Sequence, residues 1–240
     1  MIDENENESE YLLNHPEELD ILEEAIDFQT QKDYIDYSDT FDRGDLTEDE
    51  TLNLSNMLYS NKLPVEGKKK ALTLLAHLGS VTAFRQIEKY YNNPDNDLKQ
   101  WSALALQECK MFLENKLTDR MSGFVSSGLG GFKNRLRFYF LVLPLEDQLF
   151  TEIQKHVIQD EFNLVAKKYR SLVESFDLSD TYVGFIVLMP MDIAVDTLMA
   201  AGIKKCNELG EFVLESYYAT NLGIPGEPEI KEIIRIVRSD

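Results

Sequence analysis

The chain has 240 residues, 43% apolar and 28% charged, a composition typical of a globular protein with one large domain or two small ones. No apolar stretch reaches the roughly 18 residues of a membrane span, and the start lacks a secretory leader. Cys109 and Cys206 are too few and too far apart for a disulfide framework or a zinc site. These features predict a cytoplasmic protein and argue against a membrane partner.

The net charge of −19 is concentrated at the start of the chain. Residues 1–50 carry 19 acidic and 2 basic residues, whereas the rest of the chain carries 24 acidic and 22 basic residues. We expect residues 1–10 to be disordered and residues 1–50 to form a partly disordered acidic segment. Leu19, Leu22 and Ile26 follow helical spacing, which predicts one or two amphipathic helices that dock on the rest of the chain. The segment is interpreted as a solubilising cap on a helical stack, or else as a nucleic-acid mimic or an acidic partner-binding arm.

Residues 51–122 have the pattern of paired helices. A first helix is expected at about 51–60, and Pro64 opens a second whose apolar residues recur at intervals of three and four. Gly79 ends that helix and Ser80 caps the next. A turn at 92–97 precedes a fourth helix, in which Trp101 should be buried. Helix pairs of this length are what a helical solenoid stacks.

The same region resembles HEAT repeats. The stretch Lys70-Ala-Leu-Thr-Leu-Leu-Ala-His-Leu-Gly-Ser-Val-Thr-Ala-Phe84, continuing through Asn93-Pro-Asp95 to Leu98–Leu106, carries the likeness. It is also similar to a group of uncharacterised bacterial HEAT-like proteins whose repeats precede a Gly-Leu-Gly-Gly segment and an α+β domain. Here that segment is Ser127-Gly-Leu-Gly-Gly-Phe-Lys-Asn-Arg-Leu-Arg137. The resemblance implies a protein-binding scaffold and supplies no activity and no site residues.

Residues 123–240 predict a ferredoxin-like domain. Strands are expected at 136–143, 172–178, 182–189 and 212–220, with helices after Pro144 and after Pro190. The order β-α-β-β-α-β is that of ferredoxin-like folds, in which the first and third strands are central. The fold class is therefore α+β, with HEAT-like helical hairpins at 51–122 followed by a ferredoxin-like (βαββαβ) domain.

A ferredoxin-like sheet has helices on one face only. Because successive side chains of a strand point to opposite faces, the sequence predicts which residues lie on the open face. The residues expected on the open face are Arg135, Arg137, Tyr139, Leu141, Phe185 and Val187. So much apolar surface needs a cover, which could be another part of the chain, a second copy or a ligand. Tyr139 and Phe185 also suit base stacking in single-stranded RNA, but the near-neutral body and acidic arm argue against nucleic acid.

The Gly-rich segment is the one candidate ligand site. Its residues Gly128, Gly130, Gly131, Lys133, Arg135 and Arg137 could hold a small anion through backbone N–H groups and cations. The segment precedes a strand and lacks the third glycine of the dinucleotide fingerprint, so a flexible interdomain turn is the competing interpretation.

No catalytic or metal-binding pattern is present in the sequence. His15, His77 and His156 are dispersed, and no nucleophile lies in a recognisable elbow. The sequence therefore predicts a non-enzymatic interaction scaffold with an unidentified protein partner and no cofactor. A homodimer remains open, and a regulatory module that binds a small anion at the Gly-rich loop is the alternative.

Overall fold

The computed structural model describes residues 19–40, 46–145 and 148–239 as two compact units, Met1–Ser127 and Gly128–Asp240 (unit 1 and unit 2). The chain is of mixed α+β type, with a two-stranded and a four-stranded sheet among these residues. The predicted disorder of residues 1–10, and His15, lie outside the described residues. No helix in the described part of the chain is long and apolar enough to cross a membrane.

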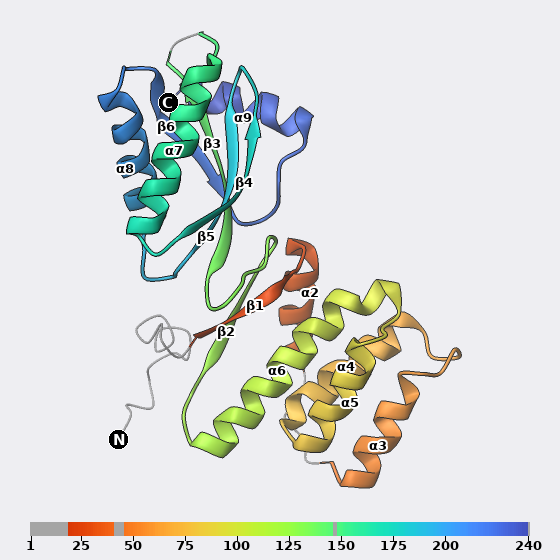
Figure 1. The fold of residues 1–240 in the computed structure, drawn as a ribbon. Coiled ribbons are helices and arrows are strands. Elements are labelled where there is room, and N and C mark those ends of the chain that lie inside the picture. The colour runs from red at the N-terminus through yellow and green to blue at the C-terminus, as the bar shows by residue number, and fades with distance from the viewer. Residues whose placement is uncertain (1–18, 41–45, 146–147, 240) are drawn as a thin grey trace. The chain divides into compact units, whose positions relative to one another are not determined.

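Unit 1 consists of helices packed beside a short parallel sheet (Figure 1). Its elements are β1 (Leu19–Ala25), α2 (Phe28–Ser38), α3 (Glu48–Met57), α4 (Val65–Leu78), α5 (Val81–Tyr91), the 3-10 turn η2 (Asn96–Leu98), α6 (Lys99–Thr118) and β2 (Gly123–Ser127). Gly79 ends α4 with a left-handed φ of 47°, and the Ser80 side chain accepts a hydrogen bond from the Ala83 N–H at the start of α5. Both signals were readable from the sequence.

The helix expected around Leu19, Leu22 and Ile26 is wrong, because residues 19–25 form strand β1. β1 pairs in parallel with β2, and Leu19 and Ile21 are both buried. Over so short a stretch, apolar residues three and four apart are compatible with a helix or a strand. The pairing partner that makes this stretch a strand, β2, lies about a hundred residues further along the chain.

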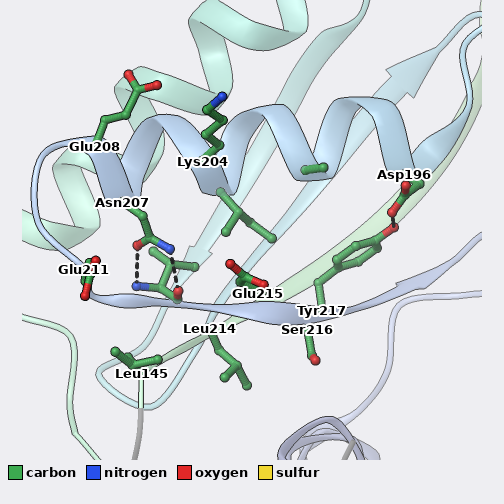
Figure 2. A pocket seen from close by; sticks show the side chains of 13 residues that line it. Leu145, Asp196, Lys204, Asn207, Glu208, Glu211, Leu214, Glu215, Ser216 and Tyr217 are labelled. Atoms are coloured by element: carbon green, nitrogen blue, oxygen red, sulfur yellow. Dashed lines mark hydrogen bonds between the residues drawn. The ribbon is translucent and has the colours of Figure 1, made fainter.

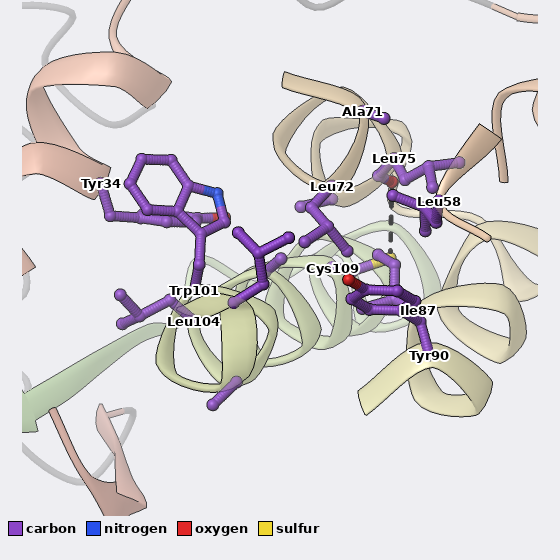
Figure 3. Close-up of a cluster of buried hydrophobic side chains, with 14 of the residues drawn as sticks. Tyr34, Leu58, Ala71, Leu72, Leu75, Ile87, Tyr90, Trp101, Leu104 and Cys109 are labelled. Atoms are coloured by element: carbon purple, nitrogen blue, oxygen red, sulfur yellow. Dashed lines mark hydrogen bonds between the residues drawn. The ribbon is translucent and has the colours of Figure 1, made fainter. Parts of the chain in front are cut away.

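The core of unit 1 gathers around α6. Trp101 is buried, as predicted, and its ring packs 5.0 Å from Tyr34 and 5.7 Å from Tyr37, both in α2. Figure 3 shows Trp101 beside Tyr34, and Cys109 directed at the Leu75 carbonyl of α4. Burial raises the pKa of the Cys109 thiol to about 12, so this thiol stays protonated at neutral pH.

Unit 2 is a sheet with helices on both faces (Figure 1). Its elements are β3 (Leu136–Pro144), α7 (Glu152–Lys168), β4 (Leu172–Leu178), β5 (Val183–Met189), α8 (Val195–Glu208), β6 (Val213–Thr220) and α9 (Glu227–Ser239). The strand order is β4-β5-β3-β6, and every pairing is antiparallel. α7 and α8 cover one face, and α9 covers part of the other.

Two helix starts in unit 2 differ from the prediction. Pro144 is the last residue of β3, and α7 begins eight residues later at Glu152, where Thr151 and Gln154 form a capping box. α8 likewise begins at Val195 and not at Pro190. α9 was not predicted, although its buried residues Ile230, Ile233 and Val237 follow helical spacing.

Candidate functional site

The Gly-rich segment folds as a tight hairpin before β3. Phe132 and Arg135 exchange backbone hydrogen bonds of 2.9 and 3.2 Å across a two-residue turn. Lys133 and Asn134 in that turn have φ angles of 48° and 60°, as a type I′ turn requires. The turn presents Phe132, 42% exposed, beside the exposed Lys133, whose ammonium lies 5.2 Å from the Phe132 ring.

The glycines of this segment have packing and turn roles. A Cβ on Gly128 would lie 1.8 Å from the Leu222 carbonyl oxygen, so only glycine fits there. The Leu129 N–H donates to Asn221 (3.1 Å), and the Phe132 N–H is used inside the hairpin. These two amides are therefore committed to the fold, and they are not available to hold an anion as the sequence suggested.

Arg137 fastens the hairpin to the sheet. Its Nε and Nη2 donate to the two carboxylate oxygens of Glu174 on β4, at 2.7 and 3.2 Å, and its Nη1 donates to the Gly131 carbonyl at 2.9 Å. This fork occupies most of the guanidinium. The arginine therefore holds Gly131 in place and is less free to bind a ligand.

A second basic segment lies at the end of α7, which sequence reasoning missed. Lys167, Lys168 and Arg170 are exposed and surround the half-buried Tyr169, with the Lys168 ammonium 5.3 Å from its ring. Arg170 pairs with Asp192 in the loop after β5, and this hydrogen bond lowers the pKa of the Asp192 carboxyl. In the sequence these cations carry no functional signal, because basic residues are common at the end of a helix.

The strand register brings the two basic segments to one end of the sheet. Leu136 pairs with Met189, and Leu172 pairs with Leu188, so β3 and β4 both begin beside the end of β5. Their starts are separated by two strand spacings, about 10 Å. We call this region the basic end: its cations are Lys133, Arg135, Arg137, Lys167, Lys168 and Arg170. It holds half of the 12 basic residues of unit 2.

The predicted open sheet face is divided between two sides. Tyr139 and Leu141 lie on the face covered by α9, where they pack with Ile230 and Ile233. Phe185 and Val187 lie on the opposite face, in the cluster beneath α7 and α8. The prediction that all four residues share one face is therefore wrong. Phe185 of β5 pairs with Phe140 and not with Tyr139, and this shift of one residue moves Phe185 and Val187 to the opposite face.

A larger hollow runs along the other edge of unit 2, between α8 and β6 (Figure 2). We call this hollow of about 870 Å³ the acidic groove. Its charged lining residues are Asp196, Lys204, Glu208, Glu211 and Glu215.

Two side-chain contacts hold the walls of the acidic groove together. The Asn207 amide bonds the backbone of Phe212 and Val213, at 3.2, 2.9 and 2.8 Å, and thereby joins α8 to β6. Tyr217 donates to Asp196 at 3.1 Å (Figure 2). An excess of carboxylates in the groove repels phosphate and carboxylate ligands.

A buried polar cluster in unit 1 involves His77. Tyr34 and Ser38 of α2 donate to the Glu108 carboxylate at 2.7 and 3.0 Å, and the Ser38 hydroxyl lies 2.7 Å from the His77 Nε2. Glu108 approaches the same nitrogen, at 3.6 Å, and His77 Nδ1 has no hydrogen-bond partner among the described residues. A Ser-His-acid relay needs its acid on the other ring nitrogen, so this cluster joins α2 to α4 and α6.

His156 lies on α7, where its Nδ1 is 2.7 Å from the Glu152 carbonyl of the same helix. In the described part of the chain, no group of three or more His, Cys, Asp and Glu residues is placed to hold a metal ion. Cys206, the second thiol, is buried in unit 2, and burial raises its pKa to about 12.

Comparisons with known proteins give structural matches alone. No family model and no curated protein matches the sequence. One similar solved structure is described as a putative transposase from Deinococcus radiodurans R1, with a TM-score of 0.35 and 12% identity over 45% of this chain and 93% of that one. Another is described as a REP-associated tyrosine transposase bound to a REP hairpin, with a TM-score of 0.32 and 9% identity over 45% and 66% of the two chains.

These matches contradict the resemblance to HEAT-repeat proteins, since the similar structures are transposases. The same finding contradicts the predictions of a non-enzymatic scaffold, of a protein partner and of an absence of nucleic acid, and it does not favour the anion-binding alternative. TM-scores of 0.35 and 0.32 carry no activity over to this chain. The function of the chain has to follow from its own residues.

Proposed function

We propose that unit 2 is a ferredoxin-like domain that binds single-stranded nucleic acid at its basic end. The observation that carries this proposal is the convergence of six cations, from segments about thirty residues apart in sequence, at one end of the sheet. Phosphate binding needs clustered Lys and Arg on a surface, and this end provides them.

The overall negative charge does not oppose this proposal. At physiological ionic strength the Debye length is about 8 Å, so exposed charges further away than this are largely screened. What acts on a bound strand is therefore the local charge. Glu174 and Asp192 pair with Arg137 and Arg170, so the six cations of the basic end outnumber the carboxylates that pair with them.

The aromatic residues of the basic end favour unpaired bases. Phe132 is exposed at the hairpin tip and Tyr169 is half-buried between the α7 cations. Aromatic side chains stack on the faces of bases in single strands, whereas the bases of a duplex are already stacked on each other. Cations together with aromatic rings are the combination used by proteins that bind single strands.

The test is fluorescence anisotropy with a labelled 16-nucleotide single-stranded DNA of mixed sequence. Lys133→Glu combined with Lys168→Glu reverses one charge in each segment and should weaken binding by about tenfold or more. Lys204→Glu combined with Lys205→Glu makes the same change in net charge on α8, on residues that are also exposed. This control should stay within about twofold of the unaltered protein.

Equal losses in both double variants would mean that binding responds to net charge alone, and would contradict the proposal. The single variants add a second criterion. If Lys133 and Lys168 contact one strand, each substitution should weaken binding on its own, and thermal melting should show that both proteins remain folded.

A further inference from the structure

A second hollow, of about 440 Å³, lies beside the basic end, between the end of β6, the loop that follows and α9. We call it the α9 hollow. The Leu129 N–H donates to Asn221, and the Gly128 backbone lies against Leu222, so the hairpin of the basic end is fixed directly to the loop that lines this hollow. A strand bound at the basic end therefore passes close to the hollow.

The walls of the α9 hollow are apolar and open to solvent. Leu222, Ile224 and Ile236 are 57%, 59% and 53% exposed, and Tyr218 contributes an aromatic ring from β6. Large apolar side chains grouped around a hollow indicate a contact surface. Its volume lies in the range of sites for small organic groups, and such groups include a nucleobase.

Two carboxylates set the polarity of the α9 hollow. Glu229 accepts a hydrogen bond from the Gly226 N–H at 2.7 Å, and Glu232 accepts one from Arg235 at 3.0 Å. In each case a single carboxylate oxygen, Oε2, makes the bond. Carboxylates repel phosphate but accept hydrogen bonds from the exocyclic amino group of a base, of which cytosine N4 is the common example.

We infer that the α9 hollow takes one unpaired base from the strand held at the basic end, and that it favours cytosine over thymine. This inference rests on the proposed function. The apolar walls and Tyr218 would contact the face of the base, as aromatic and apolar side chains do with bases taken out of a stack. The carboxylates would accept from the amino group that thymine lacks.

The experiment compares labelled dC12 and dT12 at pH 7.5 by fluorescence anisotropy. The unaltered protein should bind dC12 about fivefold more tightly than dT12, a preference within the range that one good base contact gives. Glu232→Lys removes an acceptor and adds a donor, and it should reduce this ratio to about one or invert it. Glu232 is exposed, so the substitution leaves the fold intact.

Glu215→Lys is the matched control, because Glu215 is also exposed but lies in the acidic groove. It should change the affinity for both strands alike and preserve the dC12 to dT12 ratio. Equal affinity of the unaltered protein for the two strands, or a ratio that survives Glu232→Lys, would overturn the inference and leave binding at the basic end intact. Failure of the unaltered protein to bind either strand would overturn the proposed function, and this inference with it.

Discussion

The acidic groove and the basic end belong to the same unit and differ in what they offer a ligand. The groove is the larger hollow, yet four of its five charged lining residues are carboxylates. The basic end combines six cations with exposed and half-buried aromatic rings. The charge and the residue types at the surface therefore identify the basic end as the candidate site, whereas the size of a hollow alone would have selected the acidic groove.

The two regions also arise differently from the chain. The acidic groove is built mainly by α8 and the strand that follows it, so neighbouring sequence supplies most of its residues. The basic end depends on the register between β3, β5 and β4. Because of this dependence, its composition becomes visible only once the strands are paired.

The first prediction concerns salt. If about four cations of the basic end contact phosphates of a single strand, the logarithm of the binding constant should fall against the logarithm of salt concentration with a slope of about −3. Raising the salt from about 50 to 200 mM should then weaken binding roughly 50-fold. Glu208→Gln in the acidic groove should leave the slope unchanged, and a slope near zero, measured by anisotropy titrations, would remove the basic end as the binding surface.

The second prediction separates structure from binding at the groove. Asn207→Ala removes three hydrogen bonds between α8 and the start of β6, and it should lower the free energy of unfolding by about 2 kcal/mol. Chemical denaturation followed by circular dichroism measures this change. Nucleic-acid affinity of the folded variant should be unaffected, and a parallel loss of affinity would place the groove in the binding site.

The third and smallest effect is expected at the hairpin turn. Asn134 has a φ of 60°, which glycine adopts without a steric penalty. Asn134→Gly should therefore stabilise unit 2 by only about a few tenths of a kcal/mol, because glycine also raises the entropy of the unfolded chain. Thermal melting should show a small rise, and strand affinity should stay the same because both neighbouring cations keep their places. A destabilised variant would mean that the Asn134 side chain makes a contact that the turn needs.

Much of unit 2 could be predicted because its strands are bounded by strong local signals. The strand predicted at 172–178 matches β4, and the apolar runs ending in proline at Pro144 and Pro190 mark the ends of β3 and β5. The faces of β5 could not be predicted from the same runs. Apolar residues on consecutive positions give no alternation, so the register against β3 decides which side Phe185 occupies.

The candidate site was predicted in part for the same reason. Lys133 and Arg135 were selected because the glycines around them are conspicuous in the sequence. Lys167, Lys168 and Arg170 were missed because cations in the last turn of a helix are common, and their position next to the hairpin follows from tertiary pairing alone. Arg137 was selected for a ligand, but the structure pairs it with Glu174.

The parallel pairing of β1 with β2 has a consequence for biosynthesis. β1 leaves the ribosome about a hundred residues before β2, and α2 to α6 lie between them. The helices can form early from local contacts, but the sheet of unit 1 closes only after residue 127 has emerged. Until then Leu19 and Ile21 lack their strand partner, and the nascent chain carries an unpaired apolar edge through most of the synthesis of this unit.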